Sequence, residues 1–144
     1  MRDLVSNIIF RIIVLIDTLF LLVFKKSIRQ KVYDLLREKN YTKVSIEKSS
    51  ITFFTPSYLS HWRAKTIFSK EKETINWIDN FSIEKNDIFW DIGANVGTYS
   101  LYATIKHPLV SVIAFEPSFL NLNLLSRNIN INELQEKISI VQLP

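Results

Sequence analysis

The residues that could take part in binding or catalysis lie in and around one loop. Gly93 and Gly97 are the only glycines of the 144-residue chain, and both lie in FWDIGANVGTYS at residues 89–100. Average usage gives about ten glycines in a chain of this length. Asp91 precedes the first glycine by two residues, and Glu116 follows further along the chain. This placement indicates a backbone that turns sharply or approaches a ligand closely.

Two familiar glycine-rich loops do not fit this stretch. A phosphate-binding P-loop has Lys and then Ser or Thr directly after its last glycine, whereas Thr98 and Tyr99 follow Gly97. A dinucleotide-binding GxGxxG loop would need glycines at 95 and 98, where this chain has Asn95 and Thr98. A nicotinamide-dinucleotide protein therefore remains only as a minor alternative.

A third pattern does fit, in which an acid, a GxxxG turn and a second acid follow one another. Asp91, Gly93, Gly97 and Glu116 have this order. Asp91 would repel a phosphate, but it favours a ligand that carries an ammonium and a sulfonium. Glu116 is placed to accept hydrogen bonds from both hydroxyls of a ribose. The residues therefore predict S-adenosylmethionine as the cofactor.

The surrounding pattern predicts an α/β fold that positions this loop. Apolar runs typical of strands lie at 87–94, 110–117 and 137–143, and helical patterns lie at 95–107 and 118–134. This alternation predicts a parallel sheet with right-handed crossovers. The glycine loop follows the first strand, at the sheet edge where open α/β folds bind ligands. Phe89 and Trp90 are expected in the core, and Tyr99 and Tyr102 are expected to pack their helix.

Residues 41–86 predict a lead-in to this sheet. Two short strands are expected around Val44–Ile46 and Ile51–Phe53, followed by a loop at 57–65 and a helix at 66–81. His61 and Arg63 lie in the expected loop. They are either ordinary loop residues or ligand contacts.

Residues 1–40 form an apolar and basic helical region. Sixteen of the twenty-one residues at 4–24 are apolar, enough to cross a bilayer. Arg11 and Asp17 oppose a simple span, since each costs about 2.5–3.5 kcal/mol near a helix centre. The polar residues fall within about 140° of arc, as in an amphipathic helix. Two interpretations of this helix remain open. It either associates with a membrane, in the plane of the surface or as a poor span, or it is buried against protein.

The charge distribution supports the first alternative. Lys25, Lys26, Arg29 and Lys31 follow the apolar run and could bind anionic lipid or keep that side in the cytoplasm. We therefore expect a cytoplasmic protein, attached to the cytoplasmic face of a membrane. The rest of the chain has no basic excess, so no nucleic-acid partner is predicted. The absence of cysteine excludes disulfides and thiolate metal sites, and no metal site is predicted.

Three stretches carry a resemblance to a known family. FWDIGANVGTYSLYA, AFEPSFLNLNLLSRNININ and KEKETINWIDNF resemble the FkbM-type methyltransferases, a class I S-adenosylmethionine-dependent group, over about residues 50–144. The resemblance implies a cofactor site made of Asp91, Gly93, Ala94, Asn95, Gly97, Glu116, Pro117 and Asn121. Glu116 would hold the ribose, Pro117 would fix the turn behind it, and Asn121 would brace the loop or lie at the ligand's edge.

The resemblance also implies an activity. Such enzymes mostly methylate hydroxyl oxygens of sugars, glycans or secondary metabolites. A complete class I sheet has seven strands with the first one central, so residues 87–144 are expected to be a partial domain, truncated after the third parallel strand. The sequence offers no candidate general base. A catalytically inert, membrane-associated fragment or interaction module is the alternative from another class.

Overall fold

The computed structural model describes residues 1–84 and 86–142 in two compact units. The units are Met1–Lys39 and Asn40–Pro144. Residue 85 of the expected lead-in, and residues 143 and 144 at the end of the expected third strand and domain, lie outside the described residues.

The first unit consists of two helices. Helix α1 (Arg2–Phe24) ends at Lys25, whose left-handed φ of 56° breaks the helix. Helix α2 (Arg29–Glu38) follows after a short connection. Most apolar side chains of α1 are exposed, and Asp17 is its one buried residue.

The second unit opens with an antiparallel hairpin of the expected kind. Strand β1 (Tyr41–Ile46) pairs with β2 (Ser49–Phe54), and the chain turns at Glu47, which has a φ of 44°. The alternation of the sequence buries Ile51 and Phe53 on one face, as expected for a half-buried strand.

Three short helices follow, and they correct two expectations. Residues 57–65 were expected as a loop, but α3 (Tyr58–Lys65) is a helix, because Ser57 and Ser60 form a reciprocal capping box at its start. The single helix expected at 66–81 is divided into α4 (Ile67–Lys70) and α5 (Lys72–Asp79). The break falls at Glu71, which has non-helical backbone angles of φ −131° and ψ 67°.

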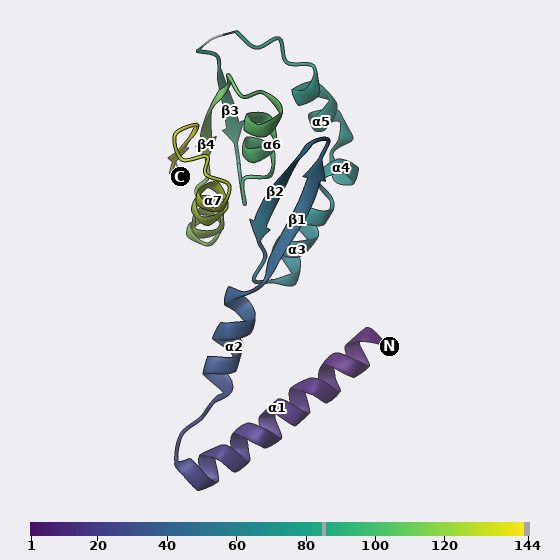
Figure 1. Ribbon diagram of the computed structural model, residues 1–144, viewed down its shortest axis with the longest axis vertical. Helices are drawn as coiled ribbons and strands as arrows, with labels where there is room; N and C mark the ends of the chain where they lie inside the picture. Colours follow the sequence, from purple (N-terminus) through teal and green to yellow (C-terminus); the bar gives the residue numbers. More distant parts are fainter. Residues whose placement is uncertain (85, 143–144) are drawn as a thin grey trace. The chain divides into compact units, whose positions relative to one another are not determined.

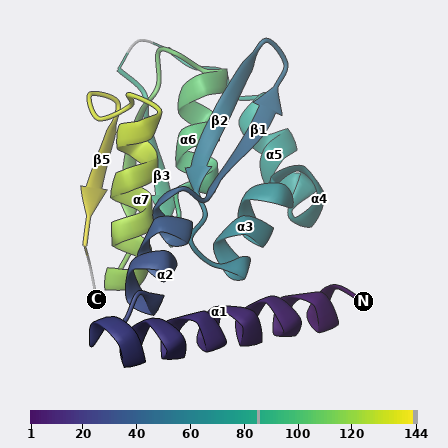
Figure 2. The same ribbon diagram turned by 60° about the horizontal axis from the view of Figure 1, so that its bottom comes forward.

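A parallel three-stranded sheet confirms the predicted fold class (Figure 1). Strands β3 (Ile88–Ile92), β4 (Ser111–Phe115) and β5 (Ile138–Val141) lie in the order β3-β4-β5. They are joined by α6 (Thr98–Lys106) and α7 (Phe119–Ile131). Figure 2 shows β2 beside α6 and α7, consistent with the contacts of both helices with β2.

Strand β3 lies at one edge of this sheet and presents an apolar face. Phe89 is buried as expected, whereas Trp90 is 60% exposed and Ile88 and Ile92 are exposed with it. The expectation that Trp90 belongs to the core was therefore wrong. Successive side chains of a strand point to opposite faces, and only the face of Phe89 and Asp91 is covered by the described residues.

Two asparagines, one in the second crossover helix and one directly after it, join the hairpin to the sheet. Asn128 is fully buried; its Oδ1 accepts from the backbone N–H of Phe54 at 2.7 Å, and its Nδ2 donates to the carbonyl of Val96 at 2.8 Å. One turn later, the Asn132 amide exchanges two hydrogen bonds with the backbone of Thr52, at 2.9 and 2.8 Å. The outer edge of β2 is thus satisfied by side chains of α7 and the residue that ends it.

Candidate cofactor-binding site

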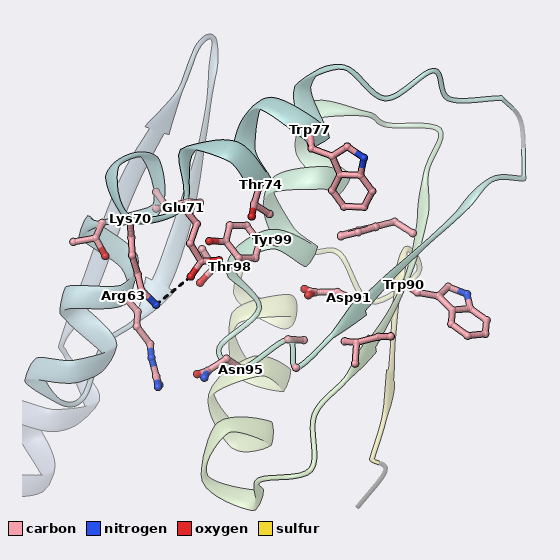
Figure 3. A pocket seen from close by; sticks show the side chains of 16 residues that line it. Arg63, Lys70, Glu71, Thr74, Trp77, Trp90, Asp91, Asn95, Thr98 and Tyr99 are labelled. Carbon is pink, nitrogen blue, oxygen red and sulfur yellow. Dashed lines mark ion pairs between the residues drawn. The ribbon is translucent and has the colours of Figure 1, made fainter.

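A cavity of about 380 Å³ lies against the carboxyl end of β3. One wall is formed by β3 and the glycine loop, including Asp91, Gly93, Ala94 and Asn95, and the other by side chains of α3, α4, α5 and α6 (Figure 3). This volume lies within the range of small-molecule sites, about 300–1,000 Å³.

The Asp91 carboxylate is the buried acid of this cavity. It is 7% exposed, and Ser100 Oγ donates to its Oδ2 at 2.5 Å. Burial raises the pKa of Asp91 above its ordinary value, and the nearby Glu116 charge adds to that rise, against the hydrogen bond from Ser100. Figure 3 shows Asp91 and Trp90 leaving β3 on opposite sides, with Asp91 directed into the cavity.

The two glycines serve different purposes. Both have left-handed backbones, with φ of 80° at Gly93 and 86° at Gly97. A Cβ added to Gly93 would meet no heavy atom within 4 Å, whereas a Cβ on Gly97 would lie 2.6 Å from Cδ1 of both Leu101 and Leu125. Gly93 therefore leaves open space at the cavity wall. Gly97 allows α6 and α7 to pack closely, and it lies outside the cavity lining.

Asn95 presents an unsatisfied acceptor at the cavity. Its backbone has a φ of 55°, and its N–H donates to Glu116 Oε2 at 2.8 Å. Its side-chain Oδ1 is buried and has no hydrogen-bond partner among residues 1–84 and 86–142. A buried acceptor without a partner is costly, so this atom suits a ligand that donates a hydrogen bond.

Glu116 is placed behind the glycine loop and braces it. The side chain is 4% exposed, and beyond the Asn95 contact its Oε1 accepts from the Ser118 N–H at 2.8 Å and from Asn121 Nδ2 at 3.2 Å. The carboxylate thus ties the glycine loop to the turn that contains Pro117. Glu116, Pro117 and Asn121 lie outside the cavity lining, and Asn121 takes the bracing position that was one of its two expected roles.

The facing wall carries polar residues of which the sequence singled out only Arg63 as a possible ligand contact. Lys70 Nζ lies 3.1 Å from Glu71 Oε1, and a hydrogen bond with Tyr99 together with this cation lowers the pKa of Glu71. Burial and the Glu71 contact raise the pKa of Tyr99. Arg63 of α3 completes this wall (Figure 3). His61, which is not part of the lining, binds Thr42 Oγ1 through Nδ1 at 2.8 Å.

The sequence is related to known methyltransferases, although no family model matches it. It is 31% identical over 97 residues to methyltransferase sdnD of Sordaria araneosa. The matched region covers 67% of this chain and 36% of that protein. It is 44% identical over 36 residues to the 31-O-demethyl-FK506 methyltransferase FkbM of Streptomyces tacrolimicus, covering 25% and 14% respectively. The resemblance to FkbM-type methyltransferases is confirmed. The chain spans about a third or less of the length of these relatives.

One solved structure supports the fold. An S-adenosylmethionine-dependent methyltransferase from Agrobacterium tumefaciens matches with a TM-score of 0.51 and 15% identity, over 70% of this chain and 31% of that one. TYW2 of Pyrococcus horikoshii, solved in complex with MeSAdo, matches with a TM-score of 0.48 and 21% identity, over 72% of this chain and 36% of that one. The first likeness and the parallel order β3-β4-β5 agree with the predicted Rossmann-like class I methyltransferase fold.

Proposed function

We propose that this chain binds S-adenosylmethionine and belongs to an enzyme that methylates a hydroxyl oxygen of a sugar, a glycan or a secondary metabolite. One observation carries the cofactor assignment. Asp91 with its buried carboxylate, Gly93 with its open backbone, and Asn95, whose buried Oδ1 has no partner among the described residues, all line a single cavity. When bound, the cofactor supplies a methyl group activated by its sulfonium.

These acceptor groups fit the methionine end of that cofactor. An ammonium group is both a cation and a hydrogen-bond donor, so it complements the Asp91 carboxylate and the Asn95 acceptor. A buried carboxylate with a raised pKa is destabilised in its charged form, and a cation beside it offsets that cost. Arg63 lines the same cavity, and its guanidinium suits the carboxylate of the same moiety.

The structure narrows the proposed role of Glu116. A carboxylate has about four lone-pair sites, and three donors of this chain already occupy Glu116, namely the Asn95 and Ser118 N–H groups and Asn121 Nδ2. One acceptor position is left for a ribose hydroxyl, rather than the two that the sequence predicted. We propose that Glu116 acts first by holding the glycine loop and second by this single contact.

The proposed acceptor is a hydroxyl group. The name of the Streptomyces relative describes methylation at an oxygen, and this supports the same acceptor chemistry here. Because the chain covers only part of its relatives, transfer is a property we propose for the whole enzyme. Cofactor binding is the part assigned to these residues.

Isothermal titration with S-adenosylmethionine and S-adenosylhomocysteine tests the cofactor assignment. We expect saturable binding by the parent chain and loss of it in Asp91→Asn, with Asp3→Asn as the matched control, because Asp3 is exposed on α1. No binding by the parent, or parental affinity in both Asp91→Asn and Glu116→Ala, would contradict the assignment and favour the inert module. Tighter binding of NAD than of S-adenosylhomocysteine would favour the dinucleotide-binding alternative.

We further propose that the unit Met1–Lys39 attaches the protein to the cytoplasmic face of a membrane. By length and composition, α1 is the one helix among the described residues that could cross a bilayer. Most of its apolar side chains are exposed, and a cluster of four cations follows it: Lys25, Lys26, Arg29 and Lys31. Sedimentation with membranes at low salt tests this attachment, and recovery of the chain in the soluble fraction would contradict it.

A further inference from the structure

The one acid in the middle of α1 is already neutralised within its own unit. Asp17 Oδ1 accepts from Ser27 Oγ at 2.7 Å and from the backbone N–H groups of Ile28 and Arg29 at 2.7 and 3.0 Å. Its Oδ2 lies 3.8 Å from Arg29 Nε, and its side chain is only 8% exposed. The carboxylate therefore caps the start of α2, where free N–H groups favour an anion.

This contact folds the chain back along α1. Asp17 precedes the end of α1 at Phe24 by seven residues, which corresponds to about 10 Å along the helix axis. Residues 27–29 must lie beside that point, because the Ser27 hydroxyl and the backbone N–H groups of Ile28 and Arg29 all reach the Asp17 carboxylate. The two helices are thus joined by a fixed elbow, defined here as Ser27, Ile28 and Arg29 bound to Asp17.

The elbow is incompatible with α1 crossing a bilayer. If Phe24 lay at one interface, Asp17, the non-helical backbone at Ser27 and the guanidinium of Arg29 would all lie about 10 Å deep in a hydrocarbon layer of about 30 Å. Non-helical backbone exposed to lipid leaves unsatisfied polar groups, and charged side chains at such depth are costly. A helix parallel to the surface avoids both costs.

The placement of the polar residues on α1 agrees with that orientation. At 100° per residue, Asp17 shares one arc of about 140° with Arg11 and Thr18, so the elbow sits on the polar side. Most exposed apolar residues of the helix, Leu15, Leu19 and Leu22 among them, lie on the remaining arc. A polar arc beside a wider apolar arc is compatible with a helix that lies in the membrane interface.

We propose that α1 lies in the plane of an anionic bilayer surface and that the elbow holds α2 on the headgroup side. The occupant of the apolar arc is lipid, and the cations at 25, 26, 29 and 31 match its negative headgroups. This inference rests on the membrane attachment proposed above and is independent of methyl transfer.

Cysteine labelling distinguishes an in-plane helix from a spanning one, since the natural chain has no cysteine. The full-length variants Ser6→Cys and Lys26→Cys place one thiol near each end of α1. Each is bound to sealed vesicles of phosphatidylcholine and phosphatidylglycerol and treated with a membrane-impermeant maleimide. We expect both thiols to react from outside, to an extent that detergent does not change. We also expect at least about tenfold stronger binding than to phosphatidylcholine alone.

The elbow itself is tested by paired substitutions in the Ser6→Cys background. Asp17→Leu removes the cap and adds apolar surface, so part of the thiol should become protected until detergent opens the vesicles. Asp3→Leu is the matched control, because it removes an acid from the same arc without touching the elbow. Asp17→Asn keeps an acceptor for the N–H groups and should remain in-plane.

Each result decides between orientations. Protection of the Ser6→Cys thiol in the parent would show a span and overturn the proposal, while leaving membrane attachment intact. Equal accessibility in the Asp17→Leu and Asp3→Leu variants would show that the elbow does not set the orientation. Failure to bind either kind of vesicle would overturn both the orientation and the attachment.

Discussion

Alanine substitutions at Gly93 and Gly97, made one at a time, should distinguish the role of Gly97 in helix packing from the role of Gly93 in ligand access. Ala at either position must adopt a φ near 80–86°, at a cost of about 1–2 kcal/mol for a left-handed L-residue. At Gly97 the added Cβ also meets Leu101 and Leu125 at 2.6 Å, and both leucines are fully buried. Moving them adds about 1–3 kcal/mol of overpacking. We therefore expect Gly97→Ala to destabilise the fold by about 2–5 kcal/mol.

Gly93→Ala provides the matched comparison. No heavy atom lies within 4 Å of its added Cβ, so only the backbone cost of about 1–2 kcal/mol applies. The difference between the two variants, about 1–3 kcal/mol, then isolates the contact between α6 and α7. Urea unfolding followed by circular dichroism measures both free energies of unfolding by linear extrapolation.

Cofactor affinity should rank the same variants in a different order. Gly93 lines the cavity, so its methyl group should weaken binding of S-adenosylhomocysteine in a chain that remains folded. Gly97→Ala should weaken binding only as far as it unfolds the chain. Equal destabilisation by the two substitutions would refute the assignment of Gly97 to helix packing. Unchanged affinity in Gly93→Ala would refute the close approach of a ligand at Gly93.

Three further substitutions test the network around the cavity. Asp91→Asn removes a buried charge, so we expect a higher melting temperature together with lost cofactor binding. Because folding raises the Asp91 pKa, the parent should lose stability relative to this variant as pH rises through that pKa. The cofactor affinity of the parent should instead fall as pH decreases through the same pKa, because the carboxylate becomes protonated. Asn128→Leu should cost about 2–5 kcal/mol in urea unfolding, since it leaves the Phe54 N–H and the Val96 carbonyl unpaired. Glu116→Gln turns one acceptor into a donor that faces N–H groups, and proteolysis should show a loosened glycine loop.

Each of these three predictions has an outcome that would contradict it. Asn130→Leu is the control for Asn128, because the Asn130 side chain is exposed on the same helix; equal losses of stability would contradict the role of Asn128. A lower melting temperature in Asp91→Asn would contradict the cost assigned to its buried charge. Unchanged proteolysis of Glu116→Gln would show that the carboxylate is not what holds the loop.

The sequence predicted the parts of this protein that depend on local pattern. Alternating apolar runs gave the parallel sheet, and the glycines gave the loop at its carboxyl edge. The helix at α3 was missed, although Ser57 and Ser60 have the spacing of a capping box. That signal was available, but a cluster of polar and aromatic residues was taken for a loop.

Other features depend on contacts that no local pattern encodes. Glu71 meets Tyr99 only because the helix break turns its side chain into the cavity. The alternation of asparagine and isoleucine in residues 128–132 gives no hint that Asn128 and Asn132 bind a strand far earlier in the chain. Trp90 is exposed because its side chain points to the face of β3 that the described residues leave uncovered. The sequence therefore predicted the loop and offered Arg63 as a possible contact, but it did not predict the other residues of the wall that faces the loop.

The bonds from α7 to the hairpin have a consequence for folding during synthesis. The Thr52 and Phe54 amides find their partners 80 and 74 residues later in the chain. At about 5–20 residues per second, a ribosome needs roughly 4–16 s to make that stretch. During this interval the outer edge of β2 is an open strand edge, which favours association with other chains. The nascent hairpin is thus open to such association until α7 has been synthesised.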